Sequence, residues 1–265
     1  MSLLEQAPGL LEALRGAMTP KFVATRSALG LPNVVPIVST TPADDQPDTL
    51  FFGNFLLRKT VQNLQEDRRL GILVITPDLK GWILKGDFLE FQSTGRYVDL
   101  QNSSALLRYN AYTGIRNAGL IRVKSVEGAV RVSKLQVARD YLLAKLAARG
   151  AADRVHGGVD MPLAVRREFA RMVAVKVLAW IGDDGYPMVI PALSLQPAGT
   201  QALVTWKGSY LPEPRLGNWV ASNILTFEAI SYQVKGRWMK NGQAGIIDVQ
   251  EAYAGGPPLP GARVA

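Results

Sequence analysis

The residues best suited to chemistry in this sequence are Arg58, Lys59 and Thr60, which lie together where the hydrophobic pattern changes. Residues 50–53 form a short apolar run typical of a buried strand end, and from residue 56 the apolar positions follow helical spacing. The three residues therefore fall in the first turn of a predicted helix. Partial positive charge at a helix start disfavours cations there unless an anion binds.

A phosphate is the anion that suits this set of groups. Backbone N–H groups, a bidentate Arg, a Lys point charge and a Thr hydroxyl all bind phosphate oxygens. The alternative is a solvated helix face with two ordinary surface cations. This stretch by itself leaves both interpretations open.

The composition narrows the chemistry further. The chain has 265 residues, of which 48% are hydrophobic and 20% charged, as expected for one large or two ordinary globular domains. It has no cysteine, which excludes disulfides, zinc–thiolate sites, iron–sulfur ligation and a thiol nucleophile. With His156 as its one histidine, catalysis must come from carboxylates, Lys, Tyr or a cofactor that carries the reactive atoms. A cofactor is the simplest of these.

Charge and segment patterns set expectations about partners and location. The net charge of +8 suits an anionic ligand. Nucleic acid is disfavoured as a partner because no long basic block or nucleic-acid-binding motif is present. No apolar run reaches the about 18 residues of a transmembrane helix, and no export signal begins the chain, so we expect a cytoplasmic protein without a membrane partner. The acidic pairs at 44–45 and 183–184 lie in predicted turns, and no metal site is predicted.

The order of predicted elements indicates a mainly β, α+β chain. The predicted strands are 21–28, 34–38, 50–53, 70–75, 81–91, 120–132, 173–180, 188–195, 202–207, 223–229 and 231–239. The predicted helices are 2–18 with a break at Pro8-Gly9, the helix that begins near 57, 103–118, 137–149 and 162–172. In the helix 137–149, the pattern places Val137, Tyr141, Leu142 and Leu146 on one apolar face.

The late strands repeat the order of the early ones. Residues 30–36 and 185–191 share the pattern Gly-X-Pro-X-Val-hydrophobic-Pro, and a later strand in each half carries Lys-Gly, at 85–86 and 235–236. In addition, residues 22–25 align with 173–176, residues 50–53 with 202–206 and residues 72–74 with 224–226. β-proteins share many such features, but the common order favours a duplicated barrel that pairs with itself inside one chain.

The two copies differ at the predicted anion site. In place of Arg58-Lys59-Thr60 the second copy has residues 211–217, with two prolines and a glutamate, although Lys207 and Arg215 remain nearby. A merely structural helix start has little reason to differ in this way. We therefore expect one anion site per chain, and the phosphate interpretation of residues 58–60 is favoured.

These features together resemble the pyridoxamine 5'-phosphate oxidase-like superfamily of FMN-binding split barrels. The resemblance rests on the 30–36 hairpin, on Phe52-Gly53-Asn54 followed by Arg58-Lys59-Thr60, and on the Lys85-Gly86 strand. It implies two tandem antiparallel split β-barrels that form an intrachain pseudo-dimer with connecting helices. The corresponding domains are residues 1–133 with the FMN site, a helical linker 134–171, and a degenerate second barrel 172–265.

The resemblance also implies the site residues. Arg58 and Lys59 would hold the FMN phosphate, with Thr60 as a hydroxyl donor. Contacts to the isoalloxazine ring and ribityl chain would come from two further groups: Asn33, Val34, Val35 and Pro36, and Phe52, Gly53 and Asn54.

The implied function is that of an FMN-dependent oxidoreductase in which the flavin N5 takes or gives a hydride to a small-molecule partner. Oxidation of vitamin B6 is disfavoured, because Gly81 stands where those family members carry Gln. A flavin-binding electron-transfer or sensor protein without turnover is the alternative, and a flavin-free barrel that binds another anion or nucleic acid is a second. FMN is favoured over deazaflavin F420 and over haem bound at His156. The substrate, the electron donor and whether the chain forms a homodimer are left open.

Overall fold

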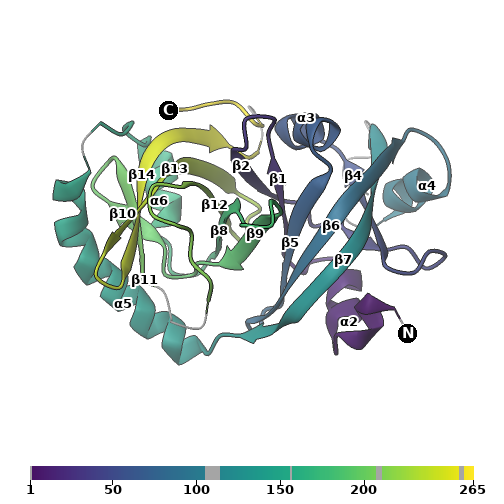
Figure 1. Cartoon of the computed structure of the whole chain (residues 1–265), viewed down its shortest axis with the longest axis horizontal. Helices are drawn as coiled ribbons and strands as arrows, with labels where there is room; N and C mark the ends of the chain where they lie inside the picture. The colour runs from purple at the N-terminus through teal and green to yellow at the C-terminus, as the bar shows by residue number, and fades with distance from the viewer. Residues whose placement is uncertain (1, 105–113, 156, 207–210, 257–259) are drawn as a thin grey trace.

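The structure is a computed structural model that describes residues 2–104, 114–155, 157–206, 211–256 and 260–265. Two seven-stranded antiparallel sheets lie side by side (Figure 1). The predicted mainly β class with two tandem barrels is confirmed.

The elements follow one another in the same order in both halves. The first sheet contains β1 (Lys21–Arg26), β2 (Pro32–Pro36), β3 (Thr41–Pro42), β4 (Thr49–Asn54), β5 (Arg69–Ile75), β6 (Lys80–Gln92) and β7 (Asn117–Arg131). The second contains β8 (Val175–Ile181), β9 (Pro187–Pro191), β10 (Gln196–Ala198), β11 (Ala202–Trp206), β12 (Trp219–Leu225), β13 (Ser231–Asn241) and β14 (Ala244–Ala254). The described helices are α1 (Leu3–Gln6), α2 (Leu10–Arg15), α3 (Arg58–Glu66), α4 (Arg96–Ser103), α5 (Lys134–Ala151), the 3-10 turn η2 (Ala152–Arg154) and α6 (Leu163–Phe169).

The two sheets have the same topology. The first runs β2-β1-β5-β6-β7-β4-β3, and the second runs β9-β8-β12-β13-β14-β11-β10, which pairs every strand with a counterpart. The two Lys-Gly pairs also correspond, because the register shifts between Lys85 and Gly86 in one sheet and between Lys235 and Gly236 in the other. Each Lys-Gly pair therefore marks a β-bulge.

The strand register corrects two of the sequence alignments. Phe22 lies opposite Pro36, and Val177 lies opposite Pro191, so Val177 rather than Val173 is the counterpart of Phe22. Phe22 also pairs with Leu73, and Val177 pairs with Asn223. Asn223 is therefore the counterpart of Leu73, two residues before the position that the sequence alignment gave. Both errors are even-numbered shifts, which leave the same side chains facing the core, so hydrophobic pattern alone does not detect them.

A shared apolar core joins the two barrels. β2 packs against β12 and β8, and the equivalent strand β9 packs against β5 and β1, so the contact repeats about a pseudo-two-fold axis. One cluster of buried residues combines Phe22, Val34 and Leu73 of the first barrel with Ile190 and Val220 of the second. Neither barrel can leave the other without exposing this surface to water.

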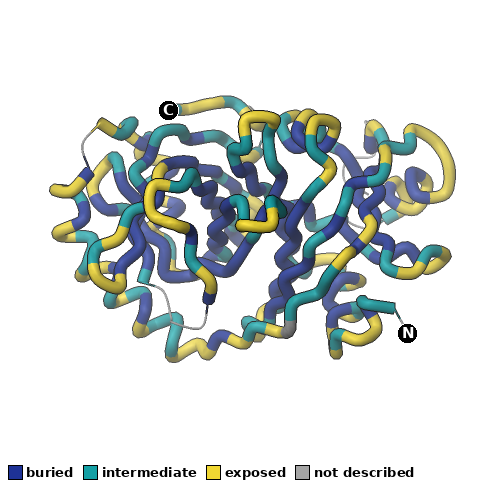
Figure 2. The backbone as a smooth tube through the Cα atoms, viewed as in Figure 1, coloured by how far each residue is buried: buried dark blue, intermediate teal, exposed yellow. Residues whose placement is uncertain are grey.

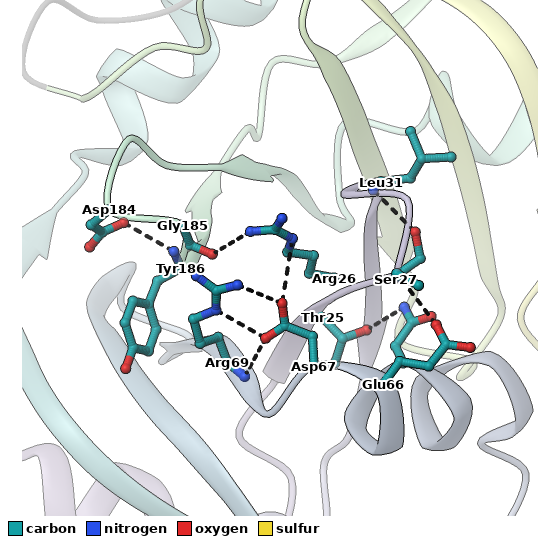
Figure 3. A network of polar contacts seen from close by, with 12 residues as sticks. Thr25, Arg26, Ser27, Leu31, Glu66, Asp67, Arg69, Asp184, Gly185 and Tyr186 are labelled. Carbon is teal, nitrogen blue, oxygen red and sulfur yellow. Dashed lines mark hydrogen bonds and ion pairs between the residues drawn. The ribbon is translucent and has the colours of Figure 1, made fainter.

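Polar groups reinforce the junction, as Figure 3 shows. Asp67 accepts hydrogen bonds from Arg69 Nε at 3.0 Å and Nη2 at 2.7 Å, and lies 3.5 Å from Arg26. The hydrogen bond from Arg69 is the first cause of a lowered Asp67 pKa. Arg26 in turn donates to the Gly185 carbonyl of the second barrel at 3.5 Å. The network thus connects β1 and β5 to the turn before β9.

Each barrel also buries a lysine at the same place. Lys21 and Lys176 occupy equivalent positions one residue before Phe22 and Val177, and they are 1% and 0% exposed. Lys21 donates to the carbonyls of Gly16 and Val38, and Lys176 donates to that of Leu195. Burial lowers their pKa values to about 8 and about 7. Both lysines fasten the segment that follows β2 or β9.

Three local predictions differ from the structure or are not tested by it. The helix predicted at 103–118 falls mostly on residues 105–113, which lie outside the described part, and only its ends are described: α4 ends at Ser103 and β7 begins at Asn117. β14 was not predicted, because its pattern is interrupted by Asp248, Gln250 and Glu251. The apolar face predicted for 137–149 is divided in the structure, since Leu142 and Leu146 are exposed.

The helices α5 and α6 follow the first sheet in the chain and precede the second, within the predicted linker 134–171. The domain boundaries themselves stay predictions. Among the described residues, no helix combines the length and apolar character that crossing a membrane requires. The same residues hold no group of three or more His, Cys, Asp or Glu side chains placed to bind a metal ion.

The bulges lead to a stability prediction. A Cβ at Gly236 would collide with the Asp248 carbonyl, and one at Gly86 would lie 2.8 Å from the Arg122 carbonyl. We expect Gly236→Ala and Gly86→Ala each to lower the free energy of unfolding by about 1–3 kcal/mol. Gly150→Ala on α5 is the control, because its Cβ meets no atom and helix propensity favours Ala by about 1 kcal/mol. Denaturant titration measures all three, and equal stability of Gly236→Ala and wild type would contradict the bulge argument.

Candidate functional site

The predicted helix start is confirmed. α3 begins at Arg58, so Arg58, Lys59 and Thr60 are its first three residues. The N-cap, Leu57, gives no side-chain hydrogen bond, and the first turn contains no acidic residue. The helix start therefore has unsatisfied N–H groups and no carboxylate of its own.

The three residues point to different surroundings. Arg58 is exposed, and among the described residues its guanidinium has no hydrogen bond or ion pair. Thr60 is buried, and its hydroxyl accepts a hydrogen bond from Asn33 Nδ2 at 3.2 Å. Lys59 is half-buried and reaches the second barrel, where its Nζ donates to Tyr253 Oη at 2.9 Å and lies 4.2 Å from the ring centroid.

The second barrel contributes the rest of the site. Lys235 on β13 lies with its Nζ 5.7 Å from the same Tyr253 ring. Tyr253 on β14 donates to Glu251 Oε2 at 2.8 Å, and Arg263 lies 3.9 Å from Glu251. We call these five residues, Lys59, Lys235, Glu251, Tyr253 and Arg263, the junction cluster. Its three cations face a single carboxylate.

Burial and the nearby positive charge both lower the pKa of Lys235. This side chain is 3% exposed, and burial is the main reason that its pKa falls to about 7. The charge of Lys59 lowers it further, while Glu251 acts in the opposite direction. Burial likewise raises the pKa of Tyr253, so the phenol stays protonated at neutral pH. A bound anion would relieve the repulsion between the two lysines.

The strand next to the cluster is covered by the second barrel. The Val34 carbonyl on β2 accepts hydrogen bonds from Asn223 Nδ2, at 3.2 Å, and from Gln233 Nε2. Asn33 and Val34 are buried, and the following Val35 and Pro36 are half-buried. The structure therefore brings Asn33, Val34, Lys59 and Thr60 together at the junction.

The other predicted group lies within the first barrel. The Phe52 side chain is fully buried and packs edge-on against Phe91, with 6.2 Å between ring centroids. The Gly53 N–H donates to Ser39 Oγ at 3.1 Å, and Asn54 Nδ2 donates to Asn117 at 3.1 Å. These contacts position the end of β4, from which the chain continues into α3.

The pseudo-symmetric position in the first barrel has a different electrostatic character. Lys85, the counterpart of Lys235, lies 2.8 Å from Asp184 and 3.4 Å from Glu127. Burial lowers the pKa of Lys85, but the hydrogen bond and charge of Asp184, together with Glu127, outweigh it and raise the pKa overall. Arg215 is exposed and paired with Asp183, while Lys207 and His156 lie outside the described residues. Carboxylates already neutralise the lysine on this side.

Sequence analysis missed the second barrel's contribution, because every predicted site residue lies in the first barrel. The repeat aligned Lys235 with Lys85 but assigned neither to the site. Tyr253 and Glu251 gave no signal, because they lie on the unpredicted strand β14. A hollow of about 270 Å³ lies elsewhere, between α2, α4 and the segment that follows β2.

Comparisons with known proteins give matches in structure only. No protein family and no curated protein matches the sequence. Among solved structures, an FMN-binding protein from Syntrophomonas wolfei is 18% identical, over 50% of this chain and 88% of that chain, with a TM-score of 0.40. A putative pyridoxamine 5'-phosphate oxidase from Lactobacillus delbrueckii is 18% identical, over 49% and 93%, with a TM-score of 0.34. The haem storage protein HutZ from Vibrio cholerae is 15% identical, over 51% and 99%, with a TM-score of 0.36.

Each match covers about half of this chain. At such identities the likeness concerns the fold, and the names describe those proteins.

The lowered pKa of Lys235 predicts a pH dependence. Its pKa falls from 10.5 to about 7 on folding, so between these values the unfolded chain binds more protons and stability rises with pH. The rise is at most about 1.4 kcal/mol per pH unit for one group. We expect the unfolding free energy of wild type to rise between pH 7 and 10 relative to that of Lys235→Met. Denaturant titrations across this range measure the difference.

Lys85→Met is the matched control, because the pKa of Lys85 is not lowered. The unfolding free energy of wild type relative to Lys85→Met should therefore not rise between pH 7 and 10. Parallel pH curves for wild type and Lys235→Met would show that Lys235 does not titrate in this window.

Proposed function

We propose that the chain binds FMN, with its phosphate at the start of α3, and acts as an FMN-dependent oxidoreductase. The observation that carries the proposal is the approach of Lys59 and Lys235 to one Tyr253 ring, with a single carboxylate nearby. The sequence resemblance to FMN-binding split barrels supplies the choice of flavin.

The groups at the junction fit a phosphate. Lys59 and Lys235 provide ammonium groups from opposite barrels, and the uncapped N-terminus of α3 provides backbone N–H groups. Arg58, which has no partner among the described residues, is exposed beside Lys59. A dianion held there would replace Tyr253 as the partner of Lys59 and would raise the pKa of Lys235.

The isoalloxazine ring fits beside β2 only after a local rearrangement of side chains. A flavin ring needs an apolar wall with a few hydrogen-bonding groups near its polar edge. Val34 offers the wall, but its carbonyl already accepts from Asn223 and Gln233. For the ring to lie along β2, these two amides must turn from Val34 toward the ligand, where amide groups are suitable partners for the ring's polar edge.

When bound, FMN supplies hydride chemistry at N5, and the protein supplies binding and electrostatics. Lys59 and Lys235 hold the phosphate end, and the paired barrels exclude water from the strand at Val34. A carrier or sensor without turnover would use the same binding residues. Anaerobic reduction of the bound flavin by NADH or NADPH supports the enzyme, and failure of both donors favours the carrier.

The same argument supports one site per chain. At the equivalent place in the other half, Asp184 and Glu127 surround Lys85 and would repel a phosphate. The expected stoichiometry is therefore one FMN for each chain.

The absorption spectrum of the purified protein and an FMN titration followed by flavin fluorescence test this site. Wild type should carry or accept FMN, giving a flavin peak. Losing one charged phosphate contact costs about 1.5–3 kcal/mol, so Lys59→Ala and Lys235→Ala should each weaken binding by roughly 10–100-fold. Arg58→Ala with Lys59→Ala should abolish retention without unfolding the chain.

Lys85→Ala is the matched control and should bind FMN as wild type does. A colourless protein that refuses added FMN at low salt would contradict the proposal, as would equal losses in Lys85→Ala and Lys235→Ala.

A further inference from the structure

Three large apolar side chains project from α5 into solvent. Leu135, Leu142 and Leu146 are 82%, 61% and 58% exposed. The helix lies at the outer edge of the molecule in Figure 1, and Figure 2 shows exposed residues recurring along it. Sequence periodicity had assigned Leu142 and Leu146 to the packed side, so their exposure needs another explanation.

The three leucines form one narrow stripe. At 100° per residue they fall within about 40° of one another around the helix, while Ala144 and Ala151 lie on the opposite, buried side. The stripe has the spacing of a contact surface rather than of isolated exposed residues.

Cations border the stripe on both sides. By the same helical geometry Lys134, Lys145 and Arg149 run along one edge and Arg139 along the other, and all four are exposed. The only acidic residue of α5, Asp140, is buried and accepts from Arg139 at 2.8 Å. The outward face therefore combines apolar side chains with three cations, Lys134, Lys145 and Arg149, that have no ion pair among the described residues, while Arg139 on the other edge is paired with Asp140.

This combination of leucines and cations favours one of three possible binding partners: a second copy of the chain, a peptide or a lipid surface. A second copy docked by the same face would place cation rows against each other, which costs energy. A peptide needs a groove, but none of the three leucines lines the main hollows of the described residues. A convex helix with leucines between rows of Lys and Arg fits an anionic lipid surface, where the leucines enter the acyl boundary and the cations meet phosphates.

We propose that α5 is a docking surface for anionic membranes, on which the helix lies parallel to the bilayer plane. The expectation that the chain has no membrane partner rested on the lack of a spanning segment and of an export signal, and surface docking requires neither. The proposal is independent of flavin binding.

Co-sedimentation with vesicles tests the proposal. With about 30% phosphatidylglycerol in phosphatidylcholine, wild type should sediment with the lipid, and with phosphatidylcholine alone it should stay in solution. Leu142→Glu with Leu146→Glu should lower partitioning at least about tenfold, and so should Lys145→Glu with Arg149→Glu. The control is Leu29→Glu, which makes the same type of substitution at an 85% exposed leucine in the β1–β2 turn and should bind as wild type does.

Circular dichroism and thermal unfolding establish that each variant is folded. Binding that is absent, that is equal on neutral vesicles, or that survives both double variants overturns the proposal. It is also overturned if sedimentation velocity shows a wild-type dimer that Leu142→Glu with Leu146→Glu dissociates, because α5 would then be a self-association surface.

Discussion

The reciprocal packing of β2 and β9 is the constraint on which the rest of the structure depends. Each of these short edge strands covers the other barrel, and the apolar core beneath them is common to both halves. Since a single sheet would leave this face in water, the two barrels stabilise each other. The charged groups at the junction are brought together as a consequence, because Lys59 and Tyr253 are 194 residues apart in the chain.

The pseudo-two-fold arrangement produces two topologically equivalent junctions, which differ in the charged residues around their lysines. Lys85 is enclosed by carboxylates, whereas Lys235 is buried beside another lysine. The first junction is a set of ion pairs that holds the barrels together. The second keeps positive charge in a partly buried place, which costs stability and is expected where a ligand compensates for it. The two junctions thus share a topology and differ in charge.

Local patterns in the sequence were sufficient for most of the strands and for the start of α3 at Arg58. Each of these is set by residues close together in the chain, such as the change from strand to helical spacing after Gly53. The register of β8 and β12 was beyond this method, because an even shift keeps the same residues buried. Tyr253 and Glu251 were also beyond it, since β14 carries charged residues and contributes to the site only through tertiary packing. The exposed leucines of α5 show the same limit, because periodicity identifies an apolar stripe without showing what it faces.

The central claim is that the junction cluster binds the phosphate of a flavin, and comparing FMN with riboflavin tests it most directly. The two ligands share the ring and ribityl chain and differ in the phosphate alone. Isothermal titration should show wild type binding FMN at least about 100-fold more tightly than riboflavin, and Lys59→Ala with Lys235→Ala binding both equally weakly. Equal affinity of wild type for the two ligands would contradict the account, because the phosphate would then contribute nothing to binding.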